Sequence, residues 1–179
     1  MKKTIEQSIK IKFLELLKTN DIESIDVKMI CDSIGIKRQS FYYHYKNIYD
    51  VICAIFSEVE LPSIEADDYD SIIIGLLDFL YTNEEFNKEV LNSSAKDIVQ
   101  EYSFSFLYRS FNKYLEKFSL RVDSLKDISR LISKAVGEQI LFYFGHGDYT
   151  KDEIFQKISY LMNSDLLNLI VKNYKNIKN

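Results

Sequence analysis

The chain has 179 residues, enough for one domain or for a small head on a larger body, and its 46% of hydrophobic residues can form a buried core. Five glycines and one proline argue against a β-sandwich or barrel with many tight turns, and two cysteines argue against the disulfide framework of a secreted protein. The net charge of −4 gives no overall attraction for nucleic acid, and the lack of a secretion signal or of an apolar run of about eighteen residues predicts a cytoplasmic protein with no membrane partner.

The first predicted helix follows Thr4. Apolar residues recur at three- and four-residue spacing from Ile5 to Leu17, which is the pattern of one buried helix face. Thr4 and Gln7 stand at the spacing of a capping box, which marks the start of the helix. The polar segment at residues 19–21 ends it.

Two short helices are predicted next, at about 27–33 and 37–43. Asp26 can cap the first one, and Gly35 lies between them, where glycine adopts left-handed backbone without steric cost. The apolar residues of both segments face inward, and Cys31 supplies the small side chain that a close approach of the two helices needs. The pattern indicates a helix-turn-helix, although an ordinary αα-hairpin within a helical bundle would give the same short elements.

The second helix of a helix-turn-helix enters the major groove of DNA, so its exposed side chains must bond base edges. Arginine can bond guanine and glutamine can bond adenine. We expect base-facing positions at Lys37, Arg38, Gln39, Ser40 and Tyr42, and phosphate contacts at Tyr43, His44 and Lys46. The charge distribution agrees, because residues 1–46 carry a net +3 and the remainder −7.

A helix at about 47–61 ends before Pro62 and leads through an acidic linker at 60–70 into the body. Five more helices are predicted at about 70–81, 84–92, 95–118, 124–145 and 151–175. Capping boxes at Thr82 with Glu85 and at Thr150 with Glu153, and a cap at Ser124, mark their starts. We therefore expect an all-α protein of about nine helices, with a DNA-binding domain at 1–46 and a dimerisation and ligand- or partner-binding helical bundle at 47–179.

The last predicted helix is apolar over a wide arc. A helix of this kind must be covered on two sides, by its own core on one side and by a second subunit on the other, unless it lies at the centre of a monomer. We expect a homodimer through residues of about 125–145 and 151–173. Two heads related by a two-fold axis would bind a palindromic operator in double-stranded DNA.

Residues 27–51 read VKMICDSIGIKRQSFYYHYKNIYDV. The pair Ile30-Cys31, the turn at Gly35, the run FYYHY at 41–45 and Lys46 with Val51 together resemble the TetR family of transcription regulators. The likeness extends over roughly residues 4–60. It implies an all-helical homodimer with a DNA-binding head and a body that receives an effector or signal.

Residue by residue, the resemblance implies base-facing roles for Lys28, Arg38, Gln39, Ser40 and Tyr42, and phosphate contacts for Tyr43, His44 and Lys46. Three positions depart from the family pattern. Cys31 replaces the usual alanine, Lys37 replaces a capping serine, and Ile48 replaces a second lysine. Residues 137–149 resemble a subgroup related to regulators of dihydroxyacetone kinase, in which some members act through a protein partner.

A ligand cavity is predicted in the body. Aromatic and polar residues fall at helical spacing on two consecutive helices, a composition that suits a small-molecule site, at Tyr102, Phe106, Arg109, Gln139 and Tyr143. A guanidinium of Arg109 in the interior would need an anion as partner. The alternatives are a packed aromatic core and an Arg109 that reaches solvent.

An enzymatic function is not expected. The two histidines, His44 and His146, are too few for a metal cluster, and the chain has no glycine-rich phosphate loop or nucleophile elbow. We therefore predict no cofactor. The expected function is a repressor released by a small effector, or a co-regulator of the same fold whose body docks a protein partner.

Overall fold

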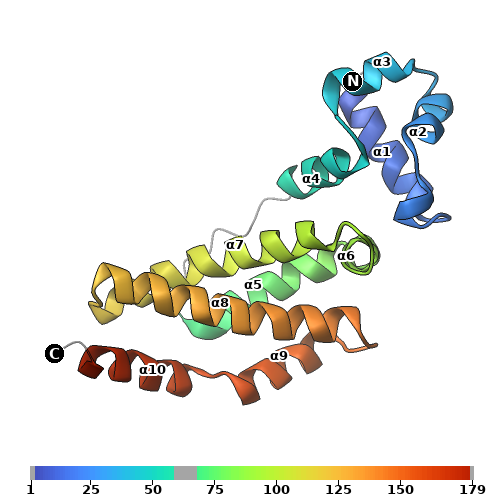
Figure 1. The fold of residues 1–179 in the computed structure, drawn as a ribbon. Coiled ribbons are helices and arrows are strands. Elements are labelled where there is room, and N and C mark those ends of the chain that lie inside the picture. Colours follow the sequence, from blue (N-terminus) through green and yellow to red (C-terminus); the bar gives the residue numbers. More distant parts are fainter. Residues whose placement is uncertain (1–2, 59–67, 178–179) are drawn as a thin grey trace. The chain divides into compact units, whose positions relative to one another are not determined.

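A computed structural model describes residues 3–58 and 68–177, and within these ranges it contains ten α-helices, two short 3-10 helices and no strand (Figure 1). The predicted all-α fold is confirmed. The chain divides into two compact units, one formed by residues 1–60 with 85–99 and the other by residues 61–84 with 100–179.

The first unit begins with α1 (Ile5–Leu17), which has the predicted capping box. The Thr4 hydroxyl accepts from the Gln7 N–H, and the Gln7 side chain accepts from the Thr4 N–H, both at 3.1 Å. A 3-10 turn, η1 (Ile22–Ser24), leads to α2 (Val27–Ile34), α3 (Arg38–His44) and α4 (Ile48–Glu58). Helix α1 contacts α2, α3 and α4, so it forms the centre of this unit.

Residues 85–99 complete the same unit. They comprise most of α6 (Glu84–Leu91) and the start of α7 (Lys96–Leu115). The rings of Phe56 and Phe86 lie 5.4 Å apart, and Val90, Ala95 and Val99 are buried. The unit is therefore discontinuous in sequence.

The second unit is a helical bundle. It contains α5 (Tyr69–Thr82), the rest of α7, η2 (Glu116–Phe118), α8 (Val122–Gly145), α9 (Lys151–Leu161) and α10 (Ser164–Ile177). Helices α7 and α8 run antiparallel (Figure 1), and they approach so closely that a Cβ at Gly137 would lie 3.2 Å from Leu107 Cδ1. Helix α9 contacts α5 and α8, and α10 contacts α8.

Three local predictions in the body were wrong. The single helix predicted at 151–175 is divided at Met162, which is extended, and the Asn163 side chain accepts from the Leu166 N–H at 2.9 Å to start α10. Thr82 is the last residue of α5, with its hydroxyl on the Asp78 carbonyl, and does not precede a helix as a cap. Ser124 is buried inside α8, whose N-cap is Arg121.

The remaining boundaries agree within a few residues. The Thr150–Glu153 capping box is present at α9. The segment assigned to the DNA-binding domain, 1–46, falls within the first unit, which also includes α4 and residues 85–99. The end of the helix predicted to residue 61 and most of the linker at 60–70 lie outside the described residues. In the part of the chain that the structure describes, no helix combines the length and apolarity needed to cross a membrane.

Candidate nucleic-acid interface

Helices α2 and α3 form a helix-turn-helix. The Asp26 carboxylate accepts from the Met29 N–H at 2.7 Å to start α2, and Gly35 ends it with a φ of 72°. A left-handed residue at this point lets the chain turn into α3 after two more residues. Ile30 and Cys31 of α2 and Phe41 of α3 are fully buried, so the two helices hold each other through this apolar contact.

The residues predicted to contact DNA lie on the opposite, outer side of this contact. Phe41 and Tyr45 are buried, and the positions around them point outward. Ser40 is half-buried, and the other eight are exposed: Lys28, Lys37, Arg38, Gln39, Tyr42, Tyr43, His44 and Lys46. Tyr42 is 55% exposed and Tyr43 85% exposed, which is unusual for large aromatic side chains at the end of a helix.

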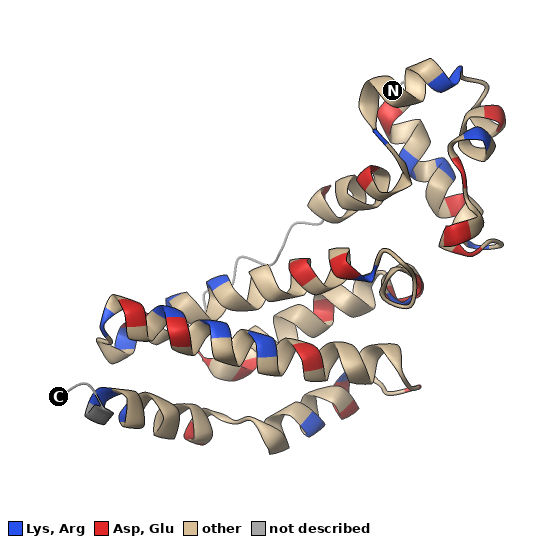
Figure 2. Cartoon of the chain, in the orientation of Figure 1, with Lys and Arg blue, Asp and Glu red and all other residues tan. Residues whose placement is uncertain are grey.

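The cations of this surface are available for a ligand. Figure 2 shows basic residues on both helices of the motif. Lys28 belongs to α2 and Arg38 to α3. Within residues 3–58 and 68–177, no carboxylate lies within ion-pair distance of Lys28, Lys37, Arg38 or Lys46. Unpaired cations beside exposed hydrogen-bonding groups can neutralise phosphates and bond base edges.

The start of α3 has a weak cap, as the departure at Lys37 suggests. Lys37 occupies the N-cap with extended backbone, but its side chain makes no capping hydrogen bond.

The end of α3 is held more firmly than its start. Asp50 accepts from the Lys46 N–H at 2.9 Å, and Asn47 accepts from the Asp50 N–H at 3.0 Å, so the backbone beside Lys46 is fixed at the start of α4. Asn47 with Asp50 three positions later is a local capping signal, so this anchor could have been predicted from the sequence.

The five residues predicted to line a ligand cavity do not share an interior site. Phe106 is buried, whereas Arg109 and Gln139 are exposed. The Arg109 Nε donates to the Ser105 carbonyl of its own helix at 3.2 Å, so its side chain lies along the surface of α7. Tyr102 stacks on Phe79 at 4.7 Å.

Tyr143, the fifth residue, lines a different feature. An open groove of about 420 Å³ lies along α8 and α9, lined by Tyr143, Glu153, Gln156, Lys157, Tyr160 and Leu161. The Lys157 ammonium lies 5.2 Å from the Tyr143 ring centroid and 4.9 Å from that of Tyr149. The groove is open to solvent and includes only Tyr143 of the five residues predicted to line a ligand cavity.

The described residues contain no group of three or more histidine, cysteine or acidic side chains that could hold a metal ion. Cys31 is buried in the contact of α2 with its neighbours, and burial raises the pKa of its thiol. Cys53, on α4, is exposed.

No family model matches the chain, and no curated protein matches it either.

Proposed function

We propose that this protein is a cytoplasmic DNA-binding transcription regulator of the TetR type, which acts as a dimeric repressor on a palindromic operator. One observation carries the proposal: eight exposed residues of the helix-turn-helix surround a helix anchored by buried Phe41, and their cations have no carboxylate partner among the described residues. This surface has the donors and the positive charge that duplex DNA requires.

The surface of α8, α9 and α10 supports the dimer. Large apolar side chains remain exposed on all three helices: Leu131, Phe142, Tyr160, Leu161, Leu166 and Leu169. Leu131 and Phe142 are eleven positions apart on α8, which places them on one face of the helix. Apolar residues gathered on such faces are typical of subunit interfaces.

A protein partner is the second candidate for the signal received by the body. Because Arg109 and Gln139 are exposed, the five predicted residues do not support an effector cavity in the body. A co-regulator whose body docks another protein would need apolar surface beyond that used by the dimer, and among the described residues of the body Ile74 and Val122 are further large apolar residues that are exposed.

The test is selection of bound sequences from a pool of randomised DNA duplexes with the full chain, followed by titration of the best duplex. We expect enrichment of a palindrome, with binding that weakens steeply as salt rises. Arg38→Ala should relax the preference at one base pair in each half-site. Recovery of no preferred sequence, together with equal binding of Arg38→Ala and the natural protein, would contradict the proposal.

A further inference from the structure

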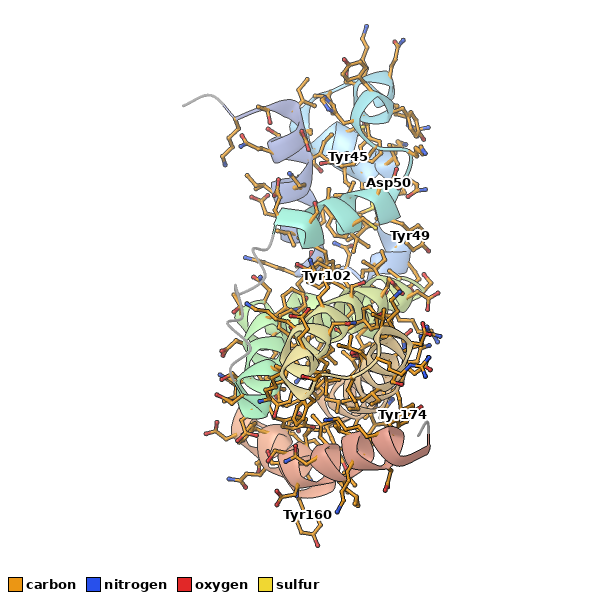
Figure 3. All side chains as sticks on the ribbon, turned by 90° about the vertical axis from the view of Figure 1, so that its left-hand side faces the viewer. Tyr45, Tyr49, Asp50, Tyr102, Tyr160 and Tyr174 are labelled. Atoms are coloured by element: carbon orange, nitrogen blue, oxygen red, sulfur yellow. The ribbon has the colours of Figure 1, made fainter. Side chains whose placement is uncertain are left out.

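Four polar side chains gather behind the helix-turn-helix, on the side away from the proposed DNA surface. Glu6 and Lys10 belong to α1, Tyr45 follows α3 directly, and Glu58 ends α4. Lys10 and Tyr45 are each only 6% exposed (Figure 3 labels Tyr45). Helices α1 and α4 and the residue that directly follows α3 thus contribute to one cluster that the proposed DNA contacts leave unused.

The cluster is organised by a buried cation. An ammonium removed from water is costly unless carboxylates surround it. Lys10 Nζ lies 3.7 Å from Glu6 Oε1 and in close contact with Glu58 Oε1. Lys10 therefore draws the carboxylates of α1 and α4 towards one point.

Glu6 extends the cluster to the end of α3. The Tyr45 hydroxyl donates to Glu6 Oε1 at 3.4 Å, the same oxygen that faces Lys10. Burial and the negative charge of Glu6 raise the pKa of the Tyr45 hydroxyl far above its ordinary value, so it stays protonated and remains a donor. The chain of contacts runs from Tyr45 through Glu6 and Lys10 to Glu58.

Helix α3 depends on contacts of this kind because it is short. It has seven residues, and its N-cap Lys37 supplies no side-chain bond. A helix of this length has little stability or fixed direction of its own. Phe41 is its only buried residue, and the Tyr45 ring packs 5.9 Å from the Phe41 ring.

We infer that Tyr45 is a positioning residue, whose hydroxyl, acting through Glu6 and the buried Lys10, sets the direction in which α3 presents its outer residues. The inference rests on the proposed function for its effect on DNA, but the direction and order of α3 are properties of the free protein. Tyr45 is buried, so its side chain is not among the proposed DNA contacts. Its loss therefore changes affinity without removing a phosphate contact.

The test compares Tyr45→Phe with Tyr49→Phe. Both remove one tyrosine hydroxyl from the first unit. The Tyr49 hydroxyl bonds to Ser94 Oγ at 2.9 Å and has no part in the cluster. In Tyr45→Phe we expect faster amide hydrogen exchange over residues 38–45 and about three- to tenfold weaker DNA binding, with an unchanged slope of log affinity against log salt. Tyr49→Phe should leave exchange over 38–45 as it is.

A double substitution tests whether Tyr45 acts through Glu6. Glu6→Ala with Tyr45→Phe should weaken binding no more than the stronger single change, because both break the same contact. Unchanged exchange over 38–45 in Tyr45→Phe would overturn the inference, whether or not DNA is bound. If the natural protein binds no duplex at all, the proposed function fails, and the exchange measurement still decides the role of Tyr45.

Discussion

The backbone N–H of Ser94 donates to the Glu23 carboxylate at 2.8 Å, which joins two residues 71 positions apart. Ser94 lies between α6 and α7, and Glu23 lies in η1. Two further hydrogen bonds join residues 85–99 to the rest of the first unit. The Tyr49 hydroxyl bonds the Ser94 hydroxyl, and the Ile22 N–H donates to Glu89 at 3.4 Å. Residues 85–99 are therefore fixed to the N-terminal helices of the first unit by directed polar bonds as well as by apolar packing.

This contact should respond to acid. The hydrogen bond from the Ser94 N–H lowers the pKa of Glu23 below its ordinary value of 4.5. Because the pKa of Glu23 is lower in the folded protein, its carboxylate stabilises the docked segment at pH values above the ordinary pKa. This stabilisation is lost as the pH falls through the lowered pKa of the folded state. Titration of the Ser94 amide by NMR from pH 7 to about 3 should give a shift with its midpoint below 4.5.

Glu23→Gln is the control for this titration, since its amide oxygen can still accept from Ser94 but does not titrate. The Ser94 amide should then be insensitive to pH over the same range. A midpoint at or above 4.5 in the natural protein would show that the bond to Ser94 does not favour the ionised carboxylate.

Lys46→Ala and Arg38→Ala should affect DNA binding in different ways. Lys46 lies beyond the end of α3, where a phosphate contact is proposed, so its loss should weaken all duplexes alike and flatten the salt slope by roughly one unit. Arg38 begins α3, and its loss should cost about 1–3 kcal/mol at one base pair. Anisotropy titrations at several salt concentrations measure both effects. Identical salt slopes and base preferences in the two variants would contradict these separate roles.

The local elements of the first unit could be predicted because their signals are local. Thr4 with Gln7, Asp26 and Gly35 each act within a few residues, and the structure has each of them in the expected role. The division of α9 from α10 was also predictable in principle. Asn163 followed by Ser164 and Asp165 is a helix start, but the continuous apolar pattern on both sides favours one helix.

The remaining features depend on contacts between distant residues. Lys10 stands beside Ile9 in the sequence, and its local partner Glu6 does not predict its burial, because the closer partner, Glu58, is 48 positions away. The place of residues 85–99 in the first unit depends in the same way on Glu23 and Phe56. The prediction that Arg109 lines a cavity was wrong for a related reason. Helical spacing shows on which face of the helix a residue lies, but not whether another element covers that face.

Gly35→Ala should destabilise the first unit by about 1–2 kcal/mol, because a Cβ in the left-handed conformation clashes with its own backbone. Apart from the adjoining backbone, no described atom lies within 4 Å of the place that this Cβ would take, so the cost is one of backbone conformation. Gly35→Asn should cost less, since asparagine tolerates this conformation better. Thermal unfolding of the three proteins gives the comparison, and equal losses for alanine and asparagine would indicate a different cause.

Phe142→Glu should convert the protein from dimer to monomer. Phe142 is 54% exposed on α8, on the same face as Leu131, and a carboxylate there would have to be buried without a partner against the second subunit of the proposed dimer. Val122→Glu is the matched control. Val122 is also on α8 and is 68% exposed, but it lies nine positions before Leu131, which turns it to the other side of the helix. Light scattering of the eluted protein at micromolar concentration should give a dimer for the natural chain and for Val122→Glu, and a monomer for Phe142→Glu.

Because operator binding by two heads requires the dimer, Phe142→Glu should also lose affinity for a palindrome while keeping its affinity for a half-site. A natural chain that is monomeric, or a Phe142→Glu variant that remains dimeric, would place the interface elsewhere or remove it.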